Sequence, residues 1–163
     1  MCLILVRIPA NIGIQFIFLN KDALHLAIQL LARREHSEKE LIHKLQAKEH
    51  SKEDALNIAE HLIAKGYLSN ERYAESMIRS RINKGYGWYY IEQELKQKGV
   101  ESHIMRAALA EQNVDWYLQA ELAYHKRFGE KAIVDQKDKA KRIRFLQYRG
   151  YAHDEIMAAL KSN

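Results

Sequence analysis

Histidine and acidic side chains are the residues of this 163-residue chain that could carry out catalysis or bind a metal. There are eight His, and three directly follow Glu, at Glu35-His36, Glu49-His50 and Glu60-His61. Neighbouring residues on a helix point about 100° apart, so such a pair cannot hold one metal ion from one face. No His-Glu-x-x-His motif occurs, and no pair of carboxylates stands isolated in the apolar context that favours general acid–base catalysis. We predict no metal site, no catalytic residue and no enzyme activity.

The glycine and cysteine content also argues against a bound cofactor. Gly85-Tyr86-Gly87 is the tightest glycine pair, but no strand is predicted before it and no Lys-Ser/Thr follows, so it lacks the context of a phosphate loop. The single cysteine, Cys2, permits no internal disulfide and no cysteine zinc site. We therefore expect no cofactor, and a reducing compartment such as the cytoplasm.

Basic residues are the side chains best suited to binding a partner. The chain has 26 Lys and Arg against 21 Asp and Glu, a net charge of +5 with a pI near 9.2. Residues 131–149 alone hold seven basic and two acidic residues, a local charge of +5. On the helix predicted over 137–149, an exposed stripe is expected at Lys137, Lys141, Arg144 and Tyr148. The inner side of that helix is expected to carry Ala140, Ile143 and Leu146.

A second basic cluster lies on the helix predicted over 70–83 and just after it. Its members are Arg72, Arg79, Arg81 and Lys84, followed by the aromatic residues Tyr86, Trp88, Tyr89 and Tyr90. Basic and aromatic side chains together suit the phosphates and bases of a nucleic acid, or an acidic or amphipathic protein. The alternative is that the aromatic residues belong to the core and the charges merely face water.

Short amphipathic helices must position these residues. Ser37 with Glu40, and Ser51 with Asp54, are predicted to start helices, and Gly66 to end the third. That third helix is expected to bury Ala55, Leu56, Ala59, Leu62 and Ile63. The other helices are predicted over 23–34, 70–83, 88–98, 102–111, 114–128, 137–149 and 153–161. The pattern predicts an all-α protein of three tandem three-helix repeats.

A constant offset relates these repeats. Shifted by 51 residues, Leu95 matches Leu146, Gly99 matches Gly150, and Ala107-Ala108-Leu109 matches Ala158-Ala159-Leu160. At an offset of 50, Leu41 and Leu45 match Ile91 and Leu95. Repeats of this length are typical of helical arrays in which each unit leans on its neighbours. The expected organisation is a leader at 1–20 and repeats at 21–66, 67–112 and 113–163.

Residues 1–20 are apolar but do not resemble a membrane segment. Arg7, Pro9, Asn11 and Gly13 interrupt the run, whereas a spanning helix needs about 20 mostly apolar residues. No small-residue cleavage site follows. Two alternatives remain open for this leader, a short strand over 12–19 or an extension upstream of the folded part.

Several ordered motifs resemble the bacterial RecX regulatory proteins. They begin with Leu-Leu-Ala-Arg-Arg-Glu-His-Ser at 30–37 and Gly-Tyr-Leu-Ser-Asn-Glu-Arg-Tyr-Ala at 66–74. They continue with Gly85-Tyr86-Gly87, residues 94–100, Arg149-Gly150-Tyr151 and residues 158–160. The resemblance covers roughly residues 22–160. Trp88-Tyr89-Tyr90 departs from the family, where a Pro and more basic residues are common.

The resemblance implies an elongated, curved array of three-helix repeats and a role in regulation. RecX-like proteins bind filaments of the recombinase RecA on DNA and restrain filament extension, ATP hydrolysis and strand exchange. They thereby modulate recombination, DNA repair and the SOS response. We expect a cytoplasmic monomer whose partners are the RecA filament and single- or double-stranded DNA within it. A helical protein that binds DNA directly, or a structural adaptor, are the alternatives.

Overall fold

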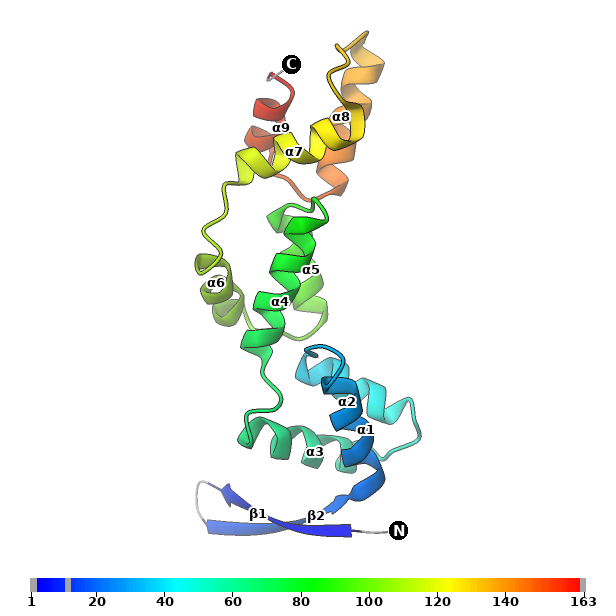
Figure 1. The fold of residues 1–163 in the computed structure, drawn as a ribbon, viewed down its shortest axis with the longest axis vertical. Helices are drawn as coiled ribbons and strands as arrows, with labels where there is room; N and C mark the ends of the chain where they lie inside the picture. The colour runs from blue at the N-terminus through cyan, green and yellow to red at the C-terminus, as the bar shows by residue number, and fades with distance from the viewer. Residues whose placement is uncertain (1–2, 11–12, 162–163) are drawn as a thin grey trace. The chain divides into compact units, whose positions relative to one another are not determined.

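A computed structural model describes residues 3–10 and 13–161, which form two strands and nine helices (Figure 1). The chain divides into two compact units, residues 1–73 and 74–163. None of the helices in the described ranges is long and apolar enough to cross a membrane.

The first unit opens with an antiparallel hairpin. Strand β1 (Leu3–Ala10) pairs with β2 (Gly13–Asn20) in a register that runs from Leu3 opposite Asn20 to Ala10 opposite Gly13. A short strand over 12–19 was one of the two alternatives for the leader, and the structure adds a partner strand that the sequence did not predict. Leu19, near the end of β2, is fully buried and joins the hairpin to the helical core.

Three capped helices follow the hairpin. They are α1 (Lys21–Leu31), α2 (Glu38–Gln46) and α3 (Lys52–Ala64). The predicted caps are present, because the Ser37 hydroxyl accepts the Glu40 N–H at 3.1 Å and the Ser51 hydroxyl accepts the Asp54 N–H at 3.0 Å. Gly66 ends the unit's third helix with a φ of +71°. The described core comprises Leu19, Ala23, Ala27, Leu41, Leu45, Ala55, Ile58, Ala59, Leu62 and Leu68.

The inner face of α3 differs from the prediction. Leu56 and Ile63 are 37% and 44% exposed, whereas Ile58 is fully buried. Leu56 and Ile63 directly follow Ala55 and Leu62 in the sequence, and the prediction assigned all four residues to the buried face of the helix. The predicted buried face was therefore too wide. Neighbouring helices cover only the stripe through Ala55, Ile58, Ala59 and Leu62.

The second unit holds the rest of the helices. Helix α4 (Asn70–Asn83) begins in the first unit and continues into the second, and it is followed by α5 (Trp88–Gln97) and α6 (Ser102–Ala110). The last three are α7 (Trp116–Phe128), α8 (Gln136–Tyr148) and α9 (His153–Ala159), and α9 packs against both α7 and α8. The predicted tandem of three-helix repeats is confirmed, with the hairpin as an addition to it.

Matching positions of the repeats have matching environments. Leu95 and Leu146 are both fully buried, and Met105 and Ile156 are both 1% exposed. Gly99 and Gly150 have φ values of +77° and +83°, and Glu49 occupies the corresponding place in the first repeat with a φ of +66°. The offset found in the sequence thus describes repeated backbone geometry, including one left-handed residue after the middle helix of each repeat.

Candidate partner-binding surfaces

The predicted stripe on α8 is exposed to water. Lys137, Lys141 and Arg144 are exposed, and Tyr148 is 82% exposed. Within residues 13–161, none of the three cations lies within 4.0 Å of a carboxylate. The stripe is therefore accessible to a partner, and no side-chain hydrogen bond or ion pair to a described residue fixes its side chains in advance.

The inner side of α8 differs from the prediction. Ala140 is exposed, and Arg142 is 3% exposed instead. Its guanidinium donates to the Asp138 carboxylate (Nη2 to Oδ2, 2.8 Å), to the Lys131 carbonyl at 2.7 Å and to the Ala132 carbonyl at 3.0 Å. The hydrogen bond from Arg142 holds the pKa of the Asp138 carboxyl below its usual range. A basic residue thus lies on the inner side of α8, where the apolar pattern predicted none, and it anchors the loop before α8.

The second basic cluster is largely engaged in internal contacts. Arg72, in the first unit, donates to the Glu35 carboxylate at 2.8 Å and to the Tyr67 carbonyl at 3.1 Å. Arg81, in the second unit, makes a two-pronged pair with Glu94 at 2.6 and 2.5 Å. The Arg79 pair with Glu75 is long, at 4.0 Å, and the two side chains are 56% and 40% exposed. Lys84 remains exposed and has no carboxylate partner among the described residues.

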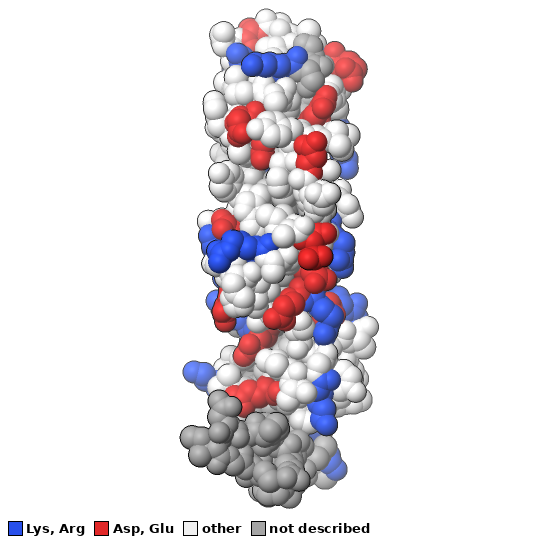
Figure 2. Space-filling view, turned by 90° about the vertical axis from the view of Figure 1, so that its left-hand side faces the viewer, with Lys and Arg blue, Asp and Glu red and all other residues white. Residues whose placement is uncertain are grey.

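Basic and acidic side chains are also mixed over a wider area of the protein surface. On the face shown in Figure 2, basic and acidic side chains are interspersed rather than gathered into one large patch. The net charge of +5 therefore does not define a surface by itself. Pairing and position decide which cations a partner can reach.

Two of the quoted sequence motifs meet in the second unit. The Gly87 N–H donates to the Arg149 carbonyl at 2.7 Å, and the Tyr89 N–H donates to the Gly150 carbonyl at 3.0 Å. The start of α5 is thereby capped by the end of α8, which satisfies backbone groups that neither helix can pair internally. We call this meeting point the α5–α8 junction. It joins the second and third three-helix repeats.

The junction leaves no room for side chains on its glycines. A Cβ on Gly87 would lie 2.4 Å from the Gly150 carbonyl oxygen, and one on Gly150 would lie 2.3 Å from the Tyr90 nitrogen. From the sequence alone, both glycines could be interpreted only as helix stops. Their close approach brings together two positions that are more than sixty residues apart in the chain.

The aromatic group beside the junction is partly to largely exposed. Tyr89 is 58% exposed, and the rings of Tyr86 and Tyr90 stack with centroids 4.1 Å apart. Trp88 lies 6.5 Å from Trp116, between ring centroids. None of the four is buried, so the alternative that these aromatic residues belong to the core is wrong.

Metal binding finds no geometric support in the described part of the chain. Among those residues, no three His, Cys, Asp or Glu side chains lie close enough together to hold an ion. His36 shows what a buried histidine does here: its Nδ1 is 3.0 Å from the Arg34 carbonyl and its Nε2 is 3.0 Å from the Lys44 ammonium. Burial lowers the pKa of His36, which favours its neutral form.

Comparison with known proteins gives the same order of domains. Family models described as the first, second and third three-helix domains of RecX match residues 23–62, 69–109 and 115–160. Regulatory protein RecX of Vibrio campbellii is 44% identical over 134 residues, which cover 82% of this chain and 86% of that protein. Regulatory protein RecX of Halorhodospira halophila is 38% identical over 133 residues, covering 82% and 83%.

Solved structures agree on the fold. A crystal structure of RecX from Lactobacillus salivarius superposes with a TM-score of 0.67 at 21% identity, covering 86% of this chain and 94% of that one. A second, described as regulatory protein RecX, gives a TM-score of 0.71 at 21% identity, covering 87% and 72%. At this level of identity the structures bear on the fold alone.

Proposed function

The chain belongs to the RecX family of regulatory proteins, and on this premise we propose that it binds filaments of the RecA recombinase on DNA and restrains them. Binding would limit filament extension, ATP hydrolysis and strand exchange, and so modulate recombination, DNA repair and the SOS response. We propose a role in binding, in the cytoplasm and as a monomer, with no reaction carried out by the chain itself.

The observation that carries this proposal is the ordered match of all three domains. It spans residues 23–160, and the relatives that match over the same length are named regulatory proteins. Several small domains on one chain can contact more than one protomer of a filament. Weak contacts then add through effective concentration, so no single domain needs high affinity.

The stripe Lys137, Lys141, Arg144 and Tyr148 is our proposed contact surface on the third domain, because its cations are exposed and unpaired within the described ranges. Arg79 and Lys84 are the more accessible cations of the second cluster. Arg72 and Arg81 are proposed as weaker contributors, since each already pairs with a carboxylate. Charge reversal of the stripe should weaken filament binding and change its salt dependence.

The decisive experiment measures RecA ATPase on single-stranded DNA while this protein is titrated from substoichiometric ratios. We expect inhibition well below one molecule per recombinase protomer. Inhibition that appears only when the protein saturates the DNA would favour direct competition for DNA. No inhibition at any ratio would contradict the proposal.

A further inference from the structure

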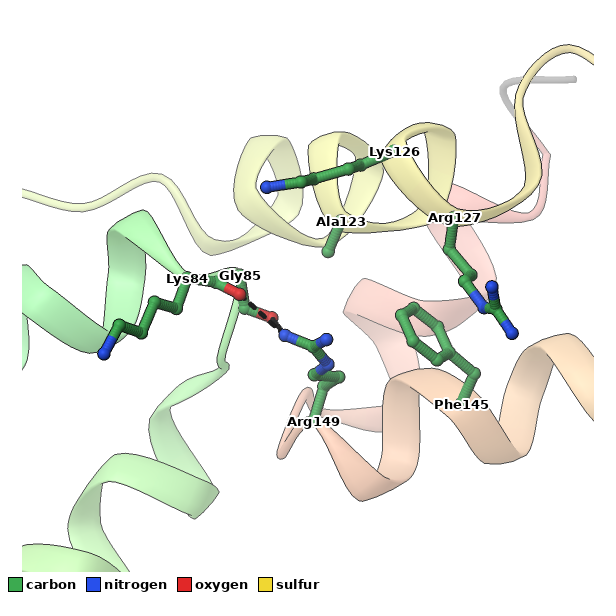
Figure 3. Close-up of a pocket in the computed structure, with 7 residues that line it drawn as sticks. All are labelled: Lys84, Gly85, Ala123, Lys126, Arg127, Phe145 and Arg149. Atoms are coloured by element: carbon green, nitrogen blue, oxygen red, sulfur yellow. Dashed lines mark hydrogen bonds between the residues drawn. The ribbon is translucent and has the colours of Figure 1, made fainter.

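A pocket in the second unit gathers cations that the sequence did not bring together. Its volume is about 210 Å³, and it is lined by Lys84, Gly85, Ala123, Lys126, Arg127, Phe145 and Arg149 (Figure 3). Four of these seven residues are basic and none is acidic. They come from the end of α4, from α7 and from α8, so the pocket exists only when the second and third repeats are joined.

The charges of this pocket are not neutralised within the protein. In the part of the chain that the structure describes, no carboxylate lies within 4.0 Å of Lys84, Lys126, Arg127 or Arg149. Other arginines of the same unit differ, since Arg81 pairs with Glu94 and Arg142 with Asp138. Four like charges around one hollow repel one another, and a bound anion would relieve that repulsion.

Arg149 is held in place while most of its donors stay available. Its Nη1 donates to the Lys84 carbonyl at 2.6 Å, and its guanidinium lies 4.6 Å from the Tyr86 ring centroid and 5.3 Å from that of Phe145. Its main chain is fixed by the hydrogen bond from Gly87 at the α5–α8 junction. Among the described residues, Nε and Nη2 have no protein acceptor. A fixed guanidinium with spare donors is suited to two oxygens of one anion.

Lys84, Lys126 and Arg127 complete the basic lining of the pocket. In Figure 3, Lys126 extends along α7 toward the side of Lys84, and the Phe145 ring lies between the guanidinium groups of Arg149 and Arg127. Lysine side chains act as flexible point charges, and arginine adds directional donors. Gly85 and Ala123 add no bulk, which leaves space between the cations.

We propose that this pocket binds a phosphate group, and that the phosphate belongs to the backbone of a single-stranded nucleic acid. The lining offers cations and one aromatic ring already covered by Arg149, and it offers no side-chain acceptor that would read a base. Recognition is therefore of charge and phosphate geometry, independent of sequence. Lys84 and Lys126 add positive charge for the neighbouring phosphates of the same strand. This binding requires no recombinase, so it goes beyond the proposed regulatory role.

The test measures binding of a fluorescent single-stranded oligonucleotide to the full chain, without recombinase, by anisotropy at several salt concentrations. The variants are Arg127→Gln and the double variant Arg127→Gln/Arg149→Gln. Arg106→Gln is the matched control, because Arg106 is an exposed residue on α6 outside the pocket and loses the same charge. The Arg127 side chain makes no hydrogen bond or ion pair to a described residue, so its variant is expected to fold normally even where the double variant is less stable.

The double variant is expected to lower affinity at least about tenfold at low salt. It should make the slope of log affinity against log salt shallower by about 1.4, since each phosphate contact on a single strand contributes about 0.7. Arg127→Gln alone should lower affinity by about threefold or more and the slope by about 0.7, while Arg106→Gln stays within about twofold of the parent.

Three results would overturn the proposal. Equal losses in Arg127→Gln and Arg106→Gln would show that only total charge matters. Unchanged affinity in the double variant would remove the pocket from nucleic-acid binding. Calorimetric binding of inorganic pyrophosphate with no binding of the oligonucleotide would assign the pocket to a free phosphate compound instead of a strand.

Discussion

Arg142 and Arg149 are seven residues apart, close to two turns of helix, so they leave α8 on the same side. Arg142 is 3% exposed and donates to a carboxylate, a tyrosine hydroxyl and two carbonyls. Arg149 is half-buried and bonds only to carbonyls of Lys84 and Gly85 among the described residues. Carbonyl oxygens orient a guanidinium without cancelling its charge. We infer that Arg142 serves the fold and Arg149 serves a partner.

The difference between Arg142 and Arg149 shows why counting charges along the sequence does not locate a binding surface. Residues 131–149 carry seven basic residues, and both arginines belong to that window. One of them is matched by Asp138, and the other lies in a pocket with Lys126 and Arg127, which precede the window. Availability depends on pairing and on neighbours brought in from other helices.

The largest expected effect comes from removing Arg142. Arg142→Ala would remove the hydrogen bonds that Arg142 donates to the Tyr124 hydroxyl and to two loop carbonyls and leave Asp138 without its ion pair to Arg142, and we expect a loss of about 4 kcal/mol in the free energy of unfolding. Urea unfolding followed by circular dichroism would measure it. Arg144→Ala, an exposed neighbour, should change the same quantity by less than about 0.5 kcal/mol. Equal effects would contradict the structural role of Arg142.

A smaller loss is expected at the residue after Arg149. Gly150→Ala would place a Cβ 2.3 Å from the Tyr90 nitrogen at a φ of +83°, so we expect about 3 kcal/mol of destabilisation. Gly66→Ala is the matched control, because its φ is +71° and a Cβ there meets nothing within 4 Å. That control should lose only about 1 kcal/mol. If the two variants unfold alike, the close approach at the α5–α8 junction does not stabilise the protein.

The first repeat allows the opposite change. Glu49 stands where the other repeats have Gly99 and Gly150, and its φ of +66° is unfavourable for a residue with a Cβ. Glu49→Gly is expected to raise the free energy of unfolding of the first unit by about 1 kcal/mol. Thermal unfolding would show a higher midpoint for that unit, and an unchanged or lower midpoint would contradict the repeat equivalence.

Lowering the pH should change the contributions of the two arginines to stability differently, and by less than the substitutions above. The folded pKa of Asp138 lies below its usual value because Arg142 donates to it, so this pair stabilises the fold at neutral pH and the contribution is lost as the pH falls through that lowered pKa. Asp138→Asn should flatten the acid limb of stability below about pH 4. Arg149→Gln should leave the shape of that limb unchanged, because no carboxylate of a described residue lies within 4.0 Å of Arg149. Unfolding midpoints between neutral pH and pH 3 would test both.

Local sequence patterns predicted most of the helices. Capping serines, glycine stops and the repeated spacing placed α4 at its observed bounds and most other helix ends within a few residues. These signals depend on residues only a few positions apart, so they can be identified from a single sequence. The three-domain order followed from the constant offset.

Long-range packing set the features that the sequence did not reveal. Ile58 is buried whereas Leu56 and Ile63 are exposed, and Arg142 is buried whereas Ala140 is exposed, because the neighbouring helices decide which stripe is covered. The predicted stripe on α8 was placed correctly on the surface. The pocket was missed because Lys84, Arg127 and Arg149 come from three separate helical segments. No spacing rule links residues that meet only through the α5–α8 junction.

The most direct test asks whether Arg149 contributes to inhibition of the recombinase. It titrates the parent protein and Arg149→Gln into a RecA ATPase assay on single-stranded DNA, with both proteins confirmed as folded by circular dichroism. We predict that the parent inhibits at substoichiometric ratios and that Arg149→Gln needs about a tenfold higher concentration for the same inhibition. Superimposable inhibition curves, or no inhibition by either protein, would contradict the account.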